Sequence, residues 1–158
     1  MLFRSRDGLV TSRLPVDPDL RAVVCLPDEA ISTKSARGVI PREFPIGDAV
    51  FNLGRTALLV AAFATKDWGL LRDAMDDRIH QPARGGIFPA LQPTIEAALA
   101  SGAHGAALSG AGAAIIALAT DRFKEIATAM HEAATQHGYP NETLELGLTN
   151  RGAEVITG

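Results

Sequence analysis

The spacing of apolar and polar residues predicts strands toward both ends of the chain and helices between them. Strands are expected in apolar or alternating runs bounded by Pro, Gly or Asp, at residues 8–14, 20–26, 105–108, 114–119, 144–148 and 153–156. The run at 20–26 is apolar throughout its centre, which places it in the middle of a sheet. The runs at 105–108 and 114–119 are joined by a short turn and predict an antiparallel hairpin.

Helices are expected where apolar residues recur every three or four positions, at residues 32–39, 46–64, 67–78 and 91–100, and in a further long segment capped by Asp121 and ended by Gly138. Residues 81–86 are expected to form a loop. Apolar side chains cover most of the circumference of the helix at 46–64, which predicts that it is well buried. Its polar exceptions fall on one stripe, formed by Asp48, Asn52 and Arg55.

This order of elements favours one fold class over others. Strands and helices that segregate into runs are typical of α+β proteins rather than of doubly wound parallel sheets. We therefore expect an antiparallel sheet with helices packed on one face. The length of 158 residues suits one domain, and the hydrophobic content of 47% is enough for a core.

Composition and charge exclude several classes of function. The net charge of −3, with both signs scattered along the chain, gives no basic footprint for nucleic acid. The longest apolar stretch, residues 56–65, is shorter than the roughly 20 residues that span a bilayer. The single cysteine, Cys25, lies in an apolar strand and is interpreted as a core residue. These features predict a soluble, cytoplasmic protein with no membrane partner.

A glycine-rich segment joins the two hairpin strands and is the strongest candidate for ligand binding. It consists of Ser109, Gly110, Ala111 and Gly112. Glycine lets the backbone come close to a bound group, so that several N–H groups can point at an anion. An ordinary hairpin turn explains the same residues equally well. The segment has neither the Lys nor the spacing of a P-loop, and a strand rather than a helix follows it, which excludes the dinucleotide-binding fingerprint.

Three further positions carry polar chemistry. Arg84 lies in the predicted loop, where a guanidinium is suited to bidentate capture of a carboxylate or phosphate, with a solvated surface loop as the alternative. Thr33 and Arg37 are four residues apart and share a helix face, with a helix cap and an exposed Arg as the alternative. His80 has no second His or Cys at metal-ligand spacing and is interpreted as structural.

Four segments in this order carry a resemblance to one family: residues 32–37 (Ser-Thr-Lys-Ser-Ala-Arg), 48–52 (Asp-Ala-Val-Phe-Asn), 77–82 (Asp-Arg-Ile-His-Gln-Pro) and 108–112 (Leu-Ser-Gly-Ala-Gly). From about Arg4 to the end, the chain resembles the C-terminal half of the homoserine kinase family, within the GHMP superfamily of small-molecule kinases. The Asp-Arg-x-His-Gln-Pro string is the most family-specific piece. The Ser-Gly-Ala-Gly string is shared by the superfamily as its third motif, which is often followed by Pro where this chain has Ala113.

The resemblance implies a fold, a reaction and roles for residues. The fold would be the ferredoxin-like C-terminal domain of the superfamily. The reaction would be transfer of the γ-phosphoryl group of ATP to L-homoserine, giving O-phospho-L-homoserine on the way to threonine. Arg37 and Arg84 would hold the substrate carboxylate, with Thr33 beside the substrate. Residues 109–112 would support the phosphate-binding region and the substrate pocket. No metal ligand and no catalytic residue of the family falls on this sequence.

The resemblance also implies that part of the enzyme is not in this sequence. Residues 1–19 would be the return from an N-terminal ATP-binding domain, and residues 20–158 would be the C-terminal domain. ATP and Mg²⁺ would be bound mainly by that N-terminal domain, so the chain alone is predicted to have no kinase activity. An apolar face would be left for the N-terminal domain, or for a second copy in a homodimer, to cover.

Two other functions stay open at this point. The first is a different GHMP kinase acting on mevalonate or a sugar, against which the Asp-Arg-x-His-Gln-Pro string and the two Arg positions argue. The second is a non-catalytic α+β module for ligand binding or oligomerisation, which would need no nucleotide loop.

Overall fold

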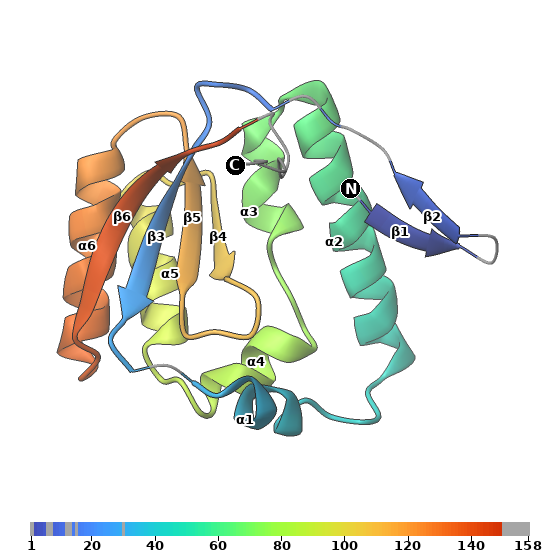
Figure 1. Cartoon of the computed structure of the whole chain (residues 1–158), viewed down its shortest axis with the longest axis horizontal. Helices are drawn as coiled ribbons and strands as arrows, with labels where there is room; N and C mark the ends of the chain where they lie inside the picture. Colours follow the sequence, from blue (N-terminus) through green and yellow to red (C-terminus); the bar gives the residue numbers. More distant parts are fainter. Residues whose placement is uncertain (1, 6–7, 12–13, 15, 30, 150–158) are drawn as a thin grey trace, which may run out of the picture.

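A four-stranded antiparallel sheet forms the centre of the molecule (Figure 1). The computed structural model describes residues 2–5, 8–11, 14, 16–29 and 31–149. The sheet has the order β4-β5-β3-β6, with β3 at Arg21–Pro27, β4 at Gly105–Leu108, β5 at Ile115–Ala119 and β6 at Asn141–Gly147. With helices between β3 and β4 and between β5 and β6, this is the βαββαβ arrangement of ferredoxin-like folds. The predicted α+β class, the central position of β3 and the antiparallel pairing of β4 with β5 are confirmed.

The start of the chain forms a separate two-stranded sheet. Strand β1 (Leu2–Ser5) pairs antiparallel with β2 (Gly8–Thr11), and neither joins the larger sheet. The predicted strand at 8–14 is therefore confirmed only as far as Thr11. The predicted strand at 153–156 lies outside the described residues.

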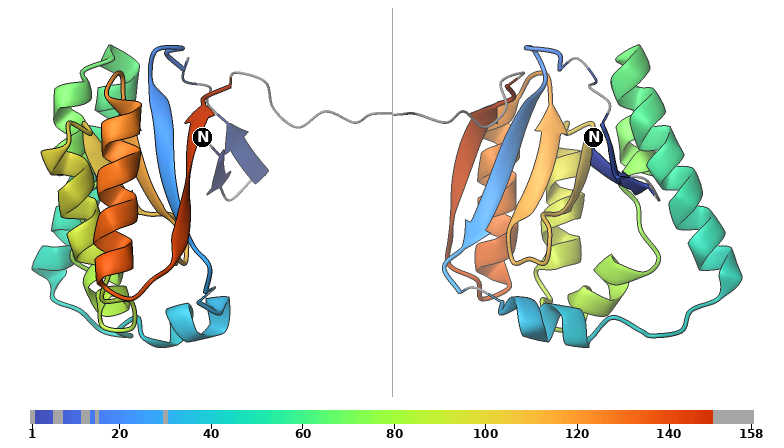
Figure 2. Two further views of the ribbon diagram at one scale, coloured as in Figure 1. Left: turned by 90° about the vertical axis from the view of Figure 1, so that its left-hand side faces the viewer. Right: turned by 45° about the vertical axis from the view of Figure 1, so that its right-hand side comes forward.

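Alternating residues of the central strands face two different hydrophobic clusters. Val23 and Cys25 of β3 pack with the helices α5 (Leu91–Ala100) and α6 (Phe123–Gln136), which lie on one face of the sheet (Figure 2). Ala22 and its strand neighbour Leu118 of β5 belong to a second cluster, formed with residues from the end of α2 (Ile46–Thr65) and from α3 (Leu71–Ala74). The helix-covered face that we expected is present, and helices contact the opposite face as well.

The helix boundaries differ from the sequence predictions at three places. The expected helix at 67–78 ends at Ala74, after the short 3-10 helix η1 (Trp68–Leu70). The loop expected at 81–86 is wrong, because His80–Gly85 forms the helix α4. The carboxylate of Asp77 caps this helix by accepting hydrogen bonds from the backbone N–H groups of His80 and Gln81. Asp121 does not cap α6, since Arg122 in the left-handed region occupies the N-cap position without a side-chain hydrogen bond. The remaining helix α1 (Thr33–Gly38) begins at the predicted cap Ser32, whose Oγ accepts from the Ser35 N–H at 3.0 Å.

The long helix α2 is not buried, contrary to our expectation. Only Ala62 of its 20 residues is buried, while Ile46, Val50 and Leu53 are 81%, 61% and 70% exposed. The helix stands beside the sheet beyond β4, and its C-terminal part alone packs on α3 (Figure 1). The all-round apolar pattern does predict a covered helix, but the described residues do not supply the surface that would cover it.

By length and composition, α2 is the one described helix that could also cross a membrane. The contiguous apolar stretch at residues 56–65 understates this property, because the whole of Ile46–Thr65 is long and apolar enough. One such helix is weak grounds for a membrane span. The polar stripe of α2 also contacts the segment that follows α3, as described below.

A glycine sets the distance between α3 and the sheet. A methyl group at Gly105, the first residue of β4, would lie 2.6 Å from Met75 Sδ and 2.7 Å from the Leu71 carbonyl oxygen. Only glycine therefore lets the end of α3 approach β4 this closely. The segment that follows α3 carries the Asp-Arg-x-His-Gln-Pro string, so this contact positions the candidate site.

The buried cysteine gives a test of the core. Cys25 is fully buried, donates a hydrogen bond from Sγ to Asn141 Oδ1 at 3.3 Å, and has its pKa raised to about 11 by desolvation. The reactive thiolate is therefore scarce at neutral pH. We expect native protein to show almost no reaction with a thiol-specific disulfide reagent at pH 8, and one equivalent of fast reaction after unfolding in urea. Fast labelling of native protein would contradict the packing of β3 against α6.

Candidate active site

The turn between β4 and β5 has a backbone suited to an anion. Ser109 N–H donates to the Ala114 carbonyl at 2.8 Å, and Gly112 N–H donates to the Ser109 carbonyl at 3.1 Å. Gly110 and Gly112 have φ of +62° and +94°, which favours glycine at both positions. The N–H groups of Gly110 and Ala111 have no hydrogen-bond partner among the described residues. Two adjacent unpaired N–H groups in a tight turn are a common anion-binding arrangement.

A cavity of about 390 Å³ lies between this turn, α2 and the segment after α3. Its walls include Asn52 and Arg55 of α2, Asp77 and His80 of the segment, and Ser109 and Gly110 of the turn. The polar stripe of α2, His80 and the glycine-rich turn are far apart in the sequence. The fold brings them to one cavity.

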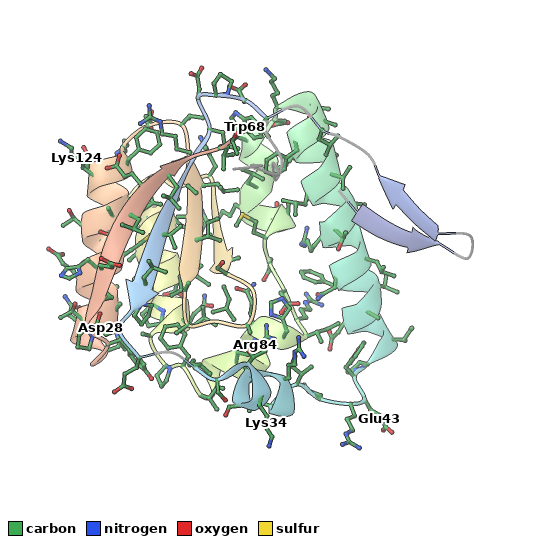
Figure 3. The ribbon with its side chains drawn as sticks, viewed as in Figure 1. Asp28, Lys34, Glu43, Trp68, Arg84 and Lys124 are labelled. Atoms are coloured by element: carbon green, nitrogen blue, oxygen red, sulfur yellow. The ribbon has the colours of Figure 1, made fainter. Side chains whose placement is uncertain are left out.

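Arg84 is the hub that connects the elements around this site. Arg84 belongs to α4 and is only 8% exposed. Its side chain contacts α1 and the β4–β5 turn (Figure 3). Its Nε donates to the Ala36 carbonyl at 3.2 Å, and its Nη1 donates to the Gly110 carbonyl at 3.0 Å and lies 3.1 Å from His80 Nδ1. Nη2 is thus the one guanidinium nitrogen of Arg84 without a partner among the described residues.

Thr33 and Arg37, the other predicted substrate residues, lie on α1. Both side chains are exposed, and the residue beside Arg37, Ala36, is buried and accepts the hydrogen bond from Arg84. The backbone of α1 is therefore joined through Arg84 to the glycine-rich turn. The side chains of Thr33, Arg37 and Arg84 are not among the residues that line the cavity, so their role toward a substrate stays a prediction.

Asp77 organises the segment between α3 and α4. Its carboxylate accepts from the backbone N–H groups of Ile79 at 3.3 Å, His80 at 2.7 Å and Gln81 at 2.5 Å, and from the side-chain amide of Asn52. Desolvation raises the pKa of this carboxyl, but the hydrogen bonds from Gln81 and Asn52 and the neighbouring His80 outweigh it, so the pKa is lowered. Asp77 is ionised at neutral pH and holds the first turn of α4 against α2.

Gln81 fixes this segment to the sheet, a role that the sequence did not reveal. Its Nε2 donates to the Met75 carbonyl at 3.2 Å, and its Oε1 accepts from the Leu108 N–H at 2.8 Å. Leu108 is the last residue of β4 and directly precedes the glycine-rich turn. The family-specific string at 77–82 and Arg84, two residues after it, therefore hold neighbouring elements together, since Asp77, Gln81 and Arg84 each bind a different element.

His80 is held neutral in the cavity wall. Desolvation lowers its pKa and the nearby Arg84 lowers it further, against the opposing charge of Asp77, whose Oδ2 lies 3.7 Å from Nε2. A neutral ring can accept the hydrogen bond from Arg84 at Nδ1, which a protonated ring could not. The structural interpretation of His80 agrees with this contact.

Two guanidinium groups stack on one aromatic ring at the α2 side of the site. The Cζ atoms of Arg55 and Arg78 lie 4.3 Å and 3.8 Å from the centroid of Phe51, within the range of cation–π attraction. Arg78 also lies 4.0 Å from a carboxylate oxygen of Asp48. Asp48 therefore pairs with Arg78 rather than with Arg55, which carries no ion pair among the described residues.

Comparison with known proteins places these features in one family. Residues 59–136 match the family described as "GHMP kinases C terminal". The chain is 38% identical over 154 residues to the homoserine kinase of Aquifex aeolicus, covering 97% of the chain and 52% of that protein. It is 38% identical over 158 residues to that of Moorella thermoacetica, covering 99% of the chain and 53% of that protein.

A solved structure agrees with the sequence comparison. The crystal structure of homoserine kinase from Cytophaga hutchinsonii superposes with a TM-score of 0.88 at 32% identity, covering 97% of this chain and 49% of that one. The mevalonate kinase of L. major, at 15% identity and a TM-score of 0.65, covering 92% of this chain and 48% of that one, shares the fold.

The fold and the sequence match define a C-terminal domain of the GHMP kinase superfamily. Within that superfamily, the chain belongs with the homoserine kinases, to which it is related over almost its whole length. It spans about half the length of the curated relatives that it matches.

Proposed function

We propose that this chain is the substrate-binding half of a cytoplasmic homoserine kinase. The whole enzyme would transfer the γ-phosphoryl group of ATP to the hydroxyl of L-homoserine and release O-phospho-L-homoserine. The observation that carries this proposal is the relation to homoserine kinases over 97–99% of the chain. The cavity beside the glycine-rich turn, joined through Arg84 to α1, supports it.

Substrate recognition would use the segments that Arg84 holds together. Arg37 and the free Nη2 of Arg84 are the donors we assign to the substrate carboxylate, with Thr33 beside them. Nε and Nη1 of Arg84 already donate to carbonyl oxygens of the protein. Arg84 would therefore contact the carboxylate through Nη2 alone rather than through a bidentate pair, and it would also hold α1, α4 and the turn together. Residues 109–112 would support the reacting phosphoryl group with their unpaired N–H groups.

ATP and Mg²⁺ would be held elsewhere in the enzyme. Within the part of the chain that the structure describes, no group of three or more His, Cys, Asp or Glu residues could hold a metal ion. The Asp77 carboxylate, which lines the cavity, is occupied by hydrogen bonds. We assign much of the Mg²⁺ environment to the nucleotide-binding half.

The exposed apolar side of α2 would be the docking surface for the nucleotide-binding half. Its exposed residues Ile46, Val50 and Leu53 recur at spacings of four and three, which puts them on one stripe of the helix. We favour docking over a membrane span because α2 also carries Asn52, which is bonded to the Asp77 segment, and the charged Arg55. A homodimer through the same stripe is the competing arrangement.

Reconstitution tests this function. We expect no homoserine-dependent ATP consumption by the purified chain alone, and turnover when it is mixed with the separately produced nucleotide-binding half of the Aquifex aeolicus homoserine kinase. Val50→Asp should abolish both association in analytical ultracentrifugation and turnover, because it places a charge on the docking stripe. Glu43→Lys, a change of charge outside that stripe, is the control.

Two results would contradict the proposal. One is turnover by the chain alone. The other is a stable complex of the two halves that consumes ATP with mevalonate or not at all. A chain that forms dimers sensitive to Val50→Asp would assign the stripe to a second copy.

A further inference from the structure

One cationic side chain in the cavity has no partner to explain it. Arg55 is partly buried, and its Nε is shielded from solvent without a hydrogen-bond acceptor. Its guanidinium stacks on Phe51 at 4.3 Å, and no carboxylate of the described residues lies within ion-pair distance of it. A partly desolvated guanidinium without a counter-ion lowers the stability of the folded protein. Such an arrangement is typical of a residue that binds an anionic ligand.

The charged groups nearest to Arg55 already have partners, and Asp76, a further carboxylate in the cavity wall, accepts a hydrogen bond from the Asp77 N–H. Asp77 is saturated by three backbone N–H groups and the amide of Asn52, and Asp48 pairs with Arg78. Arg84 is bound to two carbonyl oxygens and to His80. Arg55 is therefore the cation of the cavity wall whose N–H groups remain for a ligand.

The opposite wall of the cavity provides complementary donors. Ser109 and Gly110 line the same cavity as Arg55, and the N–H groups of Gly110 and Ala111 are unpaired among the described residues. A guanidinium and a turn with unpaired N–H groups that line one cavity match a tetrahedral oxyanion, which accepts hydrogen bonds from several sides.

We propose that Arg55 is a phosphoryl-binding residue that contacts an oxygen of the phosphoryl group while the turn at 109–112 contacts the others. The stacking on Phe51 fixes the plane of the guanidinium before the anion arrives, so little side-chain entropy is lost on binding. This proposal rests on the proposed function, which it deepens by separating the residue that binds the phosphoryl group from those that bind the carboxylate.

Phosphate binding by the isolated chain is the direct test. Titration of the ¹⁵N-labelled chain with inorganic phosphate should shift the amide signals of Gly110 and Ala111 in a saturable way. Arg55→Gln should weaken this binding at least about tenfold, in keeping with the strength of a charge-assisted hydrogen bond. Arg55→Lys should bind with intermediate affinity, because it keeps the charge and loses the planar fork.

A matched control is available on a distant part of the sheet. Arg21 also stacks on an aromatic ring, with Cζ 5.1 Å from the centroid of Phe123, and it does not line the cavity. Arg21→Gln loses the same charge and the same kind of contact, and it should leave phosphate affinity unchanged. Equal affinities for Arg55→Gln and Arg21→Gln, or shifts that avoid the turn, would overturn the proposal.

The reconstituted enzyme separates this inference from the proposed function. Arg55→Gln should lower kcat there and leave the KM for homoserine within about twofold, since it acts on the transferred group. If no variant turns over homoserine, the proposed function fails while the phosphate titration still decides the role of Arg55. If Arg55→Gln prevents association of the two halves and leaves phosphate binding intact, Arg55 is an interdomain contact and the proposal is wrong.

Discussion

Arg84→Met is expected to lower the free energy of unfolding by about 2–4 kcal/mol, a far larger loss than changes at exposed charged residues usually cause. Methionine keeps an unbranched apolar stem but leaves the carbonyl oxygens of Ala36 and Gly110 without their donor. Buried acceptors that lose a partner are destabilising because their desolvation is no longer offset by a hydrogen bond. Urea denaturation followed by circular dichroism measures the change.

Arg37→Met is the matched control for this prediction. Arg37 has the same proposed role toward the substrate carboxylate, but its side chain is exposed and lies in the last turn of a helix of six residues. We expect its loss to change stability by no more than about 0.5 kcal/mol, and to weaken homoserine binding in the reconstituted enzyme. Equal stability losses in the two variants would mean that Arg84 is not the hub between α1, α4 and the turn.

The sequence predicted the sheet well because the signals there are local. The apolar run of β3 marks a strand with neighbours on both sides, and the turn residues between β4 and β5 can only join two adjacent antiparallel strands. The same reasoning failed for α4. Gln81, Pro82 and the glycines that follow are typical of a loop, but Asp77 caps this segment from outside and favours a helix. A cap three residues upstream of the first helical residue is visible in a sequence only if the helix is already suspected.

The burial of α2 was predicted wrongly for a different reason. An apolar pattern shows that a helix needs a partner surface, but it does not show whether that surface lies in the same chain. The exposure of Val50 and Leu53 reflects this ambiguity, and relatives of about twice the length are consistent with a partner elsewhere.

The sequence predicted which segments form the candidate site. It did not predict which residues in those segments bind other parts of the protein and which remain for a ligand. The sequence identified Arg84 as a candidate for carboxylate or phosphate binding in a predicted loop. It could not show that two carbonyl oxygens from distant segments would occupy that cation, since those contacts span 48 and 26 residues. The same limit hid Gln81, whose amide joins the α3–α4 segment to β4, and left Arg55 in a polar stripe that we assigned mainly to structure, with a ligand contact as the alternative.

Asp77→Ala is expected to lower the free energy of unfolding by about 2–4 kcal/mol, because four donors lose their common acceptor. The Asp77 side chain is 6% exposed, so water cannot readily replace the carboxylate. Asp76→Ala is the control, since Asp76 is exposed and its side chain accepts a hydrogen bond from the Asp77 N–H at 2.8 Å. Urea titration of both variants at pH 7 gives the comparison.

The pH dependence of the free energy of unfolding separates the contribution of the Asp77 charge from that of its side-chain shape. Its pKa is lower in the folded protein than in the unfolded chain, where it is about 3.9. The resulting stabilisation is complete above that value and is lost as the pH falls through the folded-state pKa. His80, whose pKa is also lowered, causes a separate decline that starts as the pH falls below about 6.5, because the unfolded chain takes up the proton first. Asp77→Asn should therefore make the decline below about pH 4 shallower and keep the one above it, while Asp17, whose pKa is lowered by a backbone hydrogen bond from Asp19 and by Lys66, still contributes in the lower range. If the stability of the Asp77→Asn variant still falls in the lower range as steeply as that of the unaltered chain, another carboxylate is responsible.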